Sequence, residues 1–174
     1  MSKIIVTPLS ALEAAIRRYQ PSHVITLLSP ENMIDTPPGV APLRHLRIAV
    51  NDVTDPATAD QPPAPAHVEA MLTFAGKWSA EEPLLVHCWA GISRSMAAAF
   101  ILLNQRLGAG NEAAIATAMR RRAPHAYPNL LLVRHADVQL GRDGAMVRAA
   151  EGMGRGLVVA EGECVELPLD LDEL

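Results

Sequence analysis

Cys88 and Arg94 are separated by five residues in the stretch HCWAGISRS, residues 87–95. An apolar run, residues 83–86, precedes this stretch and another, residues 96–103, follows it, which predicts a buried strand, a tight loop and an apolar helix. At such a loop, free backbone N–H groups and the positive end of the helix dipole favour an anion. A Cys thiolate would face that anion and an Arg guanidinium would bind it through two donors. The spacing therefore predicts a phosphate site.

The backbone of this loop suits an anion as well. The loop contains no proline, so each of its N–H groups is available as a donor. Gly91 supplies the conformational freedom that a curled nest of N–H groups requires. We therefore expect the phosphate to be bound by the Arg94 side chain and by the backbone of Trp89, Ala90, Gly91, Ile92, Ser93 and Arg94.

The motif His-Cys-x-x-Gly-x-x-Arg-Ser resembles the signature loop of the cysteine-dependent protein tyrosine phosphatase superfamily. The length of 174 residues suits its compact, dual-specificity-like branch, and the resemblance covers roughly residues 4–136. It implies that Cys88 attacks phosphorus and forms a phosphocysteine intermediate, while His87 supports the loop. Ser95 would donate a hydrogen bond to the thiolate and make it a better leaving group. The alternative interpretation of Cys88 is a buried core thiol.

Hydrolysis of a phosphate ester also needs a group that protonates the leaving oxygen and later activates water. The resemblance implies a carboxylic acid on a loop upstream of the motif. Asp52 directly follows a predicted strand and is similar to that position in spacing and setting. Asp55 is the alternative acid, because it lies in the same loop and precedes Pro56. Either aspartate would otherwise serve only an Asx-turn.

The stretch RAPHAYPN, residues 122–129, is similar to the Arg-Pro-x-x-x-Pro-Asn turn that follows the signature helix in many dual-specificity-like phosphatases. The resemblance implies that Asn129 supports the phosphate loop. Here the first proline comes one residue late, and a helix break followed by an N-cap explains Pro128 and Asn129 nearly as well.

The alternation of strand and helix patterns predicts the α/β class: a single domain with a central, mainly parallel sheet flanked by helices. Strands are predicted at residues 3–7, 23–28, 43–50 and 83–86. Helices are predicted at residues 11–19, from 66 onward, from 96 to Gly108, at 112–122 and at 129–150. Ser10 and Glu13 predict a capping box for the first helix, and Asn111 predicts an N-cap.

We expect residues 1–152 to form the phosphatase-like catalytic domain and residues 153–174 to form a C-terminal hairpin or acidic tail. Residues 157–160 and 163–167 flank a glycine turn at Gly162, which predicts the hairpin. Nothing in the sequence brings Cys164 of this segment back to Cys88, so we expect no disulfide between the two.

The composition excludes several classes of protein. Apolar residues make up 49% of the chain, but no stretch is long enough to span a bilayer and its start does not resemble a signal peptide. The net charge is −4, and six acidic residues lie at or after Glu161, so the 15 basic and 13 acidic residues of 1–160 leave +2. Such a charge is too weak for a nucleic-acid surface. The two cysteines lack disulfide or zinc spacing, which indicates a reducing cytoplasm.

The predicted function is a phosphatase that hydrolyses a phosphate monoester, with phosphotyrosine or a dual-specificity phosphoprotein as substrate. Its chemistry needs no metal or other cofactor, and the histidines show no ligand spacing. Two alternatives stay open: a phosphatase of a small-molecule phosphate ester, and a non-catalytic phosphate-binding or scaffold module. Lipid-phosphatase variants of the loop carry lysines at the positions of Trp89, Ala90, Ile92 and Ser93, which argues against an inositide.

Overall fold

A five-stranded sheet forms the centre of the computed structural model, which describes residues 3–174 and thus leaves out the first two residues of the predicted catalytic domain. The strand order is β3-β2-β4-β1-β5, in which the first four strands are parallel and β5 is antiparallel to β1. The strands are β1 (Lys3–Pro8), β2 (His23–Leu28), β3 (His45–Ala49), β4 (Leu84–Cys88) and β5 (Val165–Pro168).

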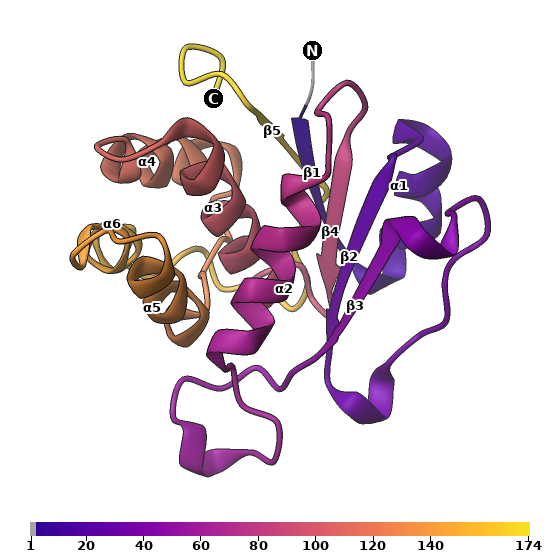
Figure 1. Ribbon diagram of the computed structural model, residues 1–174, viewed down its shortest axis with the longest axis horizontal. Helices are drawn as coiled ribbons and strands as arrows, with labels where there is room; N and C mark the ends of the chain where they lie inside the picture. The colour runs from indigo at the N-terminus through magenta and orange to yellow at the C-terminus, as the bar shows by residue number, and fades with distance from the viewer. Residues whose placement is uncertain (1–2) are drawn as a thin grey trace.

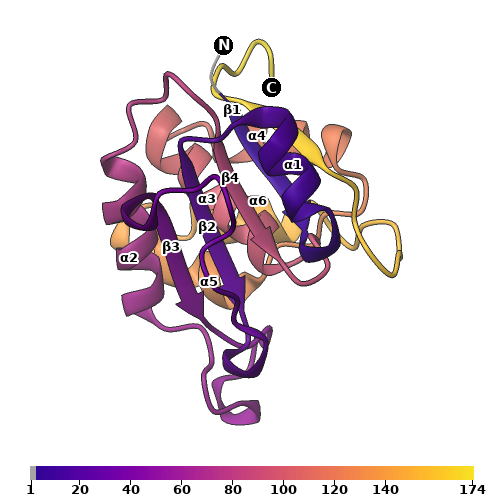
Figure 2. The ribbon, with the colours of Figure 1, turned by 90° about the vertical axis from the view of Figure 1, so that its right-hand side faces the viewer.

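Helices cover the two faces of the sheet unequally. Figure 1 shows α1 (Leu12–Tyr19) on one face and the other helices on the opposite face, and Figure 2 shows α1 and β3 from the α1 side. The helices of the larger layer are α2 (Pro65–Gly76), α3 (Arg94–Leu107), α4 (Glu112–Arg122), α5 (Leu130–Gln139) and α6 (Ala145–Gly152). This α/β architecture, with a mainly parallel sheet flanked by helices, confirms the predicted fold class. Among residues 3–174, no helix combines the length and apolarity needed to cross a bilayer.

Alternation along β4 sends neighbouring side chains of the signature motif to opposite faces of the sheet. Val86 and Cys88 belong to the large core beneath α3, whereas Leu85 belongs to the smaller core beneath α1. His87 therefore points to the α1 face. The middle of α3 is buried on all sides, with Phe100 and Ile101 fully enclosed, as its uniformly apolar sequence predicts.

Two predictions for helix ends are wrong. The capping box does not form, because α1 is entered through a 3₁₀ turn and Ser10 Oγ instead donates to Glu161 Oε1 at 2.6 Å. The predicted helix at 129–150 is two helices, α5 and α6. The carboxylate of Asp137 accepts hydrogen bonds from Gly144 N and Met146 N at 2.6 and 2.8 Å, and thereby caps α6. Asn111 occupies its predicted N-cap position, but its side chain makes no cap bond.

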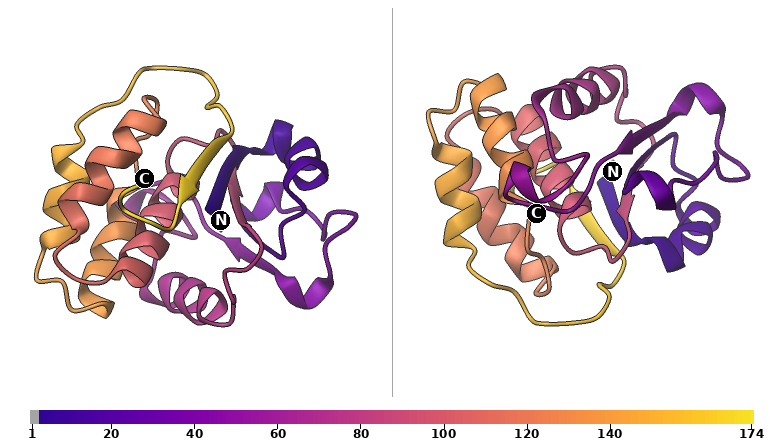
Figure 3. Two further views of the ribbon diagram at one scale, coloured as in Figure 1. Left: turned by 90° about the horizontal axis from the view of Figure 1, so that it is seen from above. Right: turned by 90° about the horizontal axis from the view of Figure 1, so that it is seen from below.

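The C-terminal segment forms one strand rather than the two strands of a hairpin. Residues 157–160 form no strand, and β5 pairs with β1 through the partners Val6 and Val165. Figure 3 shows the segment leaving α6 and crossing the molecule to place β5 beside β1. Edge pairing with β1 satisfies backbone groups that a detached hairpin would leave open on that edge. The segment therefore returns to the side of the molecule that carries the phosphate loop.

Candidate active site

The signature loop connects the end of β4 at Cys88 to the start of α3 at Arg94, as the sequence predicts. Gly91, in the middle of the loop, has a φ of +70°, which L side chains rarely adopt. A Cβ atom at this position would lie 2.9 Å from the backbone nitrogen of Pro8. Glycine is therefore required there by conformation and by space.

The carbonyl groups of the loop are held from outside by segments far apart in the sequence. Leu9 N donates to Trp89 O at 3.1 Å, and Gly162 N donates to Ala90 O at 2.8 Å. Tyr127 N donates to Ile92 O at 2.9 Å, and the carbonyl of Ser93 accepts from the backbone N–H of residues 97 and 129 at 2.8 and 3.3 Å. With these carbonyls turned outward, we expect the N–H groups of the loop to face the inside of the curve, as in an anion nest.

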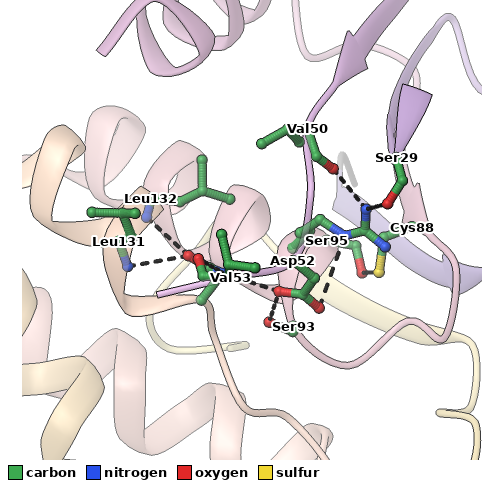
Figure 4. A network of polar contacts seen from close by, with 11 residues as sticks. Ser29, Val50, Asp52, Val53, Cys88, Ser93, Ser95, Leu131 and Leu132 are labelled. Atoms are coloured by element: carbon green, nitrogen blue, oxygen red, sulfur yellow. Dashed lines mark hydrogen bonds and ion pairs between the residues drawn. The ribbon is translucent and has the colours of Figure 1, made fainter. Parts of the chain in front are cut away.

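Cys88 lies at the base of the loop with 2% of its surface exposed. Its Sγ atom is 3.1 Å from Ser95 Oγ, in the first turn of α3 (Figure 4). The N-terminus of α3 directs the positive end of its dipole toward this position. Ser95 is within hydrogen-bond distance of the sulfur.

Arg94 is buried beside Cys88 with its guanidinium fixed from behind. Nη1 donates to Val50 O at 2.7 Å and to Ser29 Oγ at 3.3 Å (Figure 4). Its Nε is buried without a hydrogen-bond partner among residues 3–174, and it lies 3.9 Å from Asp52 Oδ2. A buried donor without a partner costs about 1–3 kcal/mol. A bound oxyanion would remove that cost.

The loop after β3 brings Asp52, rather than Asp55, to the phosphate loop. Asp52 Oδ1 accepts from Ser93 Oγ at 2.7 Å and from Asn129 Nδ2 at 2.9 Å. Asp55 Oδ1 accepts from Ala57 N at 3.0 Å and caps a 3₁₀ turn, which is the Asx-type role. Both aspartates line a cavity of about 500 Å³ beside the loop, but the contacts to the loop belong to Asp52.

The Asn129 side chain caps α5 and also contacts the loop after β3. Its Oδ1 accepts from Leu131 N and Leu132 N at 3.1 Å each and caps α5. Its Nδ2 donates to Asp52 Oδ1 and, at 3.1 Å, to Val53 O. The same side chain therefore starts a helix and fixes the loop that carries Asp52 (Figure 4).

His87 is fully buried on the α1 face, where its Nε2 lies 2.6 Å from Thr26 Oγ1. Burial lowers the pKa of His87 to about 4, from an ordinary value of 6.5. The ring is therefore neutral near pH 7. His87 is joined to the loop by its peptide bond to Cys88. A supporting role agrees with this position.

Acid should destabilise the fold through His87. In the unfolded chain His87 binds a proton below pH 6.5, but in the folded chain it does so only near pH 4. The stability that neutral His87 allows is therefore complete above pH 6.5 and falls as the pH is lowered. The expected loss between pH 7.5 and pH 4.5 is about 2–3 kcal/mol of unfolding free energy. Urea unfolding of wild type and His87→Asn at both values measures it, and an equal loss in the variant would contradict the assignment.

The sequence analysis missed several residues that hold the loop. His125 is 6% exposed, and its ring lies so close to Gly162 that a Cβ atom there would be 2.5 Å from Nε2. Thr26 and its neighbour His45 contact the α1 side of the motif through His87. His125 lies inside the stretch at 122–129 that resembles the phosphatase turn, so the sequence could have indicated that it lies near the loop. Gly162 and Thr26 are far from the motif in sequence, and no pattern around them indicated a contact with it.

Cys164 lies beside β1, close to the loop in space but on the wrong face for a disulfide. Extending the antiparallel register by one residue from the Val6–Val165 pair places Cys164 opposite Thr7. Thr7 in turn pairs with His87 in the parallel register, so the two share the α1 face. Cys88 faces the opposite layer and is two strands away, about 10 Å, against an upper limit of about 7 Å for a disulfide. The prediction of two unlinked thiols agrees with this geometry, although the segment does return to the loop.

The fold of this chain is similar to that of dual-specificity-like cysteine phosphatases of known structure. Neither protein-family models nor curated proteins give a match to the sequence. The structure does match solved structures, and three of them are phosphatases of this type. The crystal structure of DUSP15 is 20% identical with a TM-score of 0.64 over 87% of this chain and 92% of that one. Human DUSP28 is 24% identical with a TM-score of 0.59, over 79% and 91%. PTPMT1 in complex with PI(5)P is 19% identical with a TM-score of 0.57, over 84% and 94%.

Proposed function

We propose that the protein is a cysteine-dependent phosphatase that hydrolyses a phosphate monoester through a phosphocysteine intermediate. The observation that carries this proposal is the Nε of Arg94, which is buried without a hydrogen-bond partner among residues 3–174 and lies 3.9 Å from Asp52 Oδ2. A bound phosphate would give that donor its acceptor. The fold of the phosphatases with solved structures supports the same activity.

In the first step, the Cys88 thiolate attacks phosphorus and forms the S–P bond as the P–O bond to the leaving group breaks. Asp52 gives its proton to the leaving oxygen. The donors from Ser93 and Asn129 both bind Oδ1, which leaves Oδ2 for the proton. Arg94 and the loop N–H groups bind the equatorial oxygens, where negative charge is spread in the transition state.

In the second step, Asp52 accepts a proton from water as the water oxygen attacks phosphorus and the S–P bond breaks. Inorganic phosphate leaves, and the electron pair of the broken bond returns to Cys88 as a thiolate. Ser95 stabilises that thiolate by donating from Oγ, because its hydroxyl lies 3.1 Å from Sγ. Both steps are complete without an external oxidant or reductant.

We propose a phosphotyrosine or dual-specificity phosphoprotein as the substrate. The cavity beside the loop, lined by Tyr127, Pro128 and Leu130, is large enough for an amino-acid side chain. A small-molecule phosphate ester is the second candidate, because the similar PTPMT1 structure contains PI(5)P. The absence of lysine among residues 89–93 supports the phosphoprotein over an inositide. We place the catalytic residues in a domain of residues 1–152 and the protein in the cytoplasm, where a thiolate stays reduced.

Hydrolysis of para-nitrophenyl phosphate by the purified protein tests this function. Wild type is expected to turn the ester over and to be inhibited by orthovanadate, a phosphate mimic. Arg94→Lys should lose both rate and affinity, by about 10²-fold or more in kcat/KM, since a point charge cannot replace the planar fork. Vanadate binding without any hydrolysis would favour the non-catalytic phosphate-binding module instead. Near-normal activity of Arg94→Lys would contradict the proposed phosphate contact.

A further inference from the structure

Exposed apolar side chains gather around the phosphate loop. Seven large hydrophobic residues are exposed among residues 3–174, and five of them belong to the loop or to two segments that are hydrogen-bonded to it. The five are Trp89, Tyr127, Leu157, Val158 and Val159. Single apolar residues scattered over a surface are normal, whereas a group of them at one place marks a binding surface.

Four of these five side chains line one cavity of about 140 Å³, and Trp89 is the one that does not. Ile92 of the phosphate loop lines the same cavity, which is therefore continuous with the phosphate site. Tyr127 also lines the larger cavity that contains Asp52. The two cavities thus adjoin at Tyr127. The full lining of the smaller cavity is Ile92, His125, Tyr127, Arg155, Gly156, Leu157, Val158 and Val159.

The segment at 157–159 is fixed at both ends. Before it, Leu157 N donates to Pro124 O at 2.8 Å, and a Cβ atom on Gly156 would lie 2.7 Å from the same oxygen. After it, Gly162 N donates to the carbonyl of the loop residue Ala90 at 2.8 Å. The apolar side chains therefore keep their place beside the loop. A surface arranged before binding loses less conformational entropy when a ligand covers it.

The charge around these side chains favours a polypeptide over a membrane as the ligand. Residues 153–174 contain one basic residue, Arg155, and six acidic residues. Glu161 and Glu163 are exposed two and four residues after Val159. Membrane surfaces with anionic lipids attract basic segments, so an acidic segment is repelled by them.

The size of the cavity indicates a single side chain. Pockets that enclose a drug-sized ligand have volumes of about 300–1,000 Å³. The cavity of about 140 Å³ is well below that range, so it suits one aliphatic side chain rather than a long acyl chain. An extended peptide advances by about 3.3 Å per residue, and alternate side chains lie on the same face. A side chain within two positions of a residue in the larger cavity can therefore enter the smaller one.

We propose that Tyr127 and residues 157–159 form a specificity subsite, which binds an apolar side chain of the substrate polypeptide within two positions of the phosphorylated residue. The driving force is the removal of apolar surface from water on both partners. This inference rests on the proposed function, because it takes the phosphorylated residue to lie at the phosphate loop. The C-terminal segment then belongs to the substrate site, although the catalytic residues lie within 1–152.

Two phosphotyrosine peptides of equal length test the subsite, one with leucine and the other with serine at the two positions on each side of the phosphotyrosine. Wild type is expected to hydrolyse the leucine peptide with a kcat/KM about tenfold higher, at the low end of what a hydrophobic pocket contributes. In the double variant Leu157→Ser/Val158→Ser this ratio should fall to about one. Equal kcat/KM for both peptides in wild type, or an unchanged ratio in the double variant, would overturn the proposal.

The ratio is the readout because damage to the phosphate loop would lower both rates alike. Leu157 and Val158 are 66% and 79% exposed, so their replacement by serine should leave the fold intact. Val138 provides the matched control, since it is 81% exposed near the end of α5 and lines neither cavity. Val138→Ser should keep the ratio of wild type. A fall of the ratio in this variant as well would show a general effect of lost surface hydrophobicity and overturn the subsite.

Sedimentation with vesicles of phosphatidylcholine and phosphatidylserine tests the membrane alternative. Wild type is expected to stay in solution. Binding to the vesicles that the double variant loses would assign the apolar side chains to a lipid surface and overturn the proposal.

Peptide binding separates a failure of the subsite from a failure of the proposed function. If wild type hydrolyses neither the peptides nor para-nitrophenyl phosphate, the proposed function fails. The affinities of the two peptides, measured by fluorescence anisotropy, then make the same comparison. Tighter binding of the leucine peptide by wild type, but not by the double variant, would support the subsite, and equal binding of both peptides by wild type would overturn it.

Discussion

Replacement of Cys88 by serine is expected to abolish phosphate-ester hydrolysis while leaving the fold and phosphate binding intact. An alcohol at this position is a far weaker nucleophile than a thiolate, and loss of a nucleophile typically costs about 10⁴-fold or more in kcat. The hydroxyl fits the buried site and keeps a partner in Ser95, 3.1 Å from the sulfur it replaces. Turnover of para-nitrophenyl phosphate and vanadate binding by calorimetry measure the two effects.

Cys164→Ser is the control for that experiment. Cys164 is exposed and lies across β1 from the loop, so its replacement should leave kcat unchanged. Activity in Cys88→Ser close to that of wild type would refute the phosphocysteine mechanism. Loss of vanadate binding along with turnover would instead indicate that the sulfur is needed for the shape of the loop.

Asp52→Asn is expected to lower kcat by about 10²–10⁴ on esters with poor leaving groups, the usual contribution of a positioned acid. The loss should shrink when the leaving oxygen is stable as an anion, because such a substrate needs no proton. Asparagine keeps an oxygen for the hydrogen bonds from Ser93 and Asn129, so the loop after β3 should stay in place. The dependence of kcat on leaving-group pKa, measured with a series of aryl phosphates, distinguishes the variant from wild type: kcat of Asp52→Asn should fall more steeply as the leaving group becomes more basic.

Asp55→Asn is the matched comparison, since it changes the same charge three residues away. Its side chain caps a 3₁₀ turn through Ala57 N, a bond that asparagine also accepts, so little change in kcat is expected. If Asp55→Asn shows the leaving-group dependence and Asp52→Asn does not, Asp55 is the acid. If neither variant changes kcat on any ester, no carboxylate assists the leaving group and the phosphatase proposal weakens.

Contacts between residues close in the sequence were predictable. The motif at 87–95 contains its own strand end, loop and helix start, so the relation of Cys88 to Ser95 follows from local geometry. The apolar sequence of α3 likewise predicts its central position. The placement of Asp52 was predictable as one of two choices, because a loop after a parallel strand lies at the same edge of the sheet as the phosphate loop.

Contacts that depend on chain segments far apart were not predictable. Residues 157–167 have a hairpin pattern, but the open edge of β1 offers better pairing for Val165–Pro168 than a second short strand would. The break between α5 and α6 depends on Asp137, whose carboxylate reaches N–H groups seven and nine residues ahead. The connection of His45 to the motif could not be predicted either, because it runs through Thr26, a third residue on another strand.

The outward carbonyls of the phosphate loop have a consequence for the order in which the site forms during synthesis. The loop is synthesised before several of the residues that hold it in shape. Its carbonyls accept hydrogen bonds from the backbone N–H groups of Tyr127, Asn129 and Gly162, which come later in the chain. A nascent chain that ends shortly after α3 therefore contains the signature and lacks its shape. An anion that binds only the finished loop would favour the complete fold by mass action, so phosphate would act on this chain as a folding ligand.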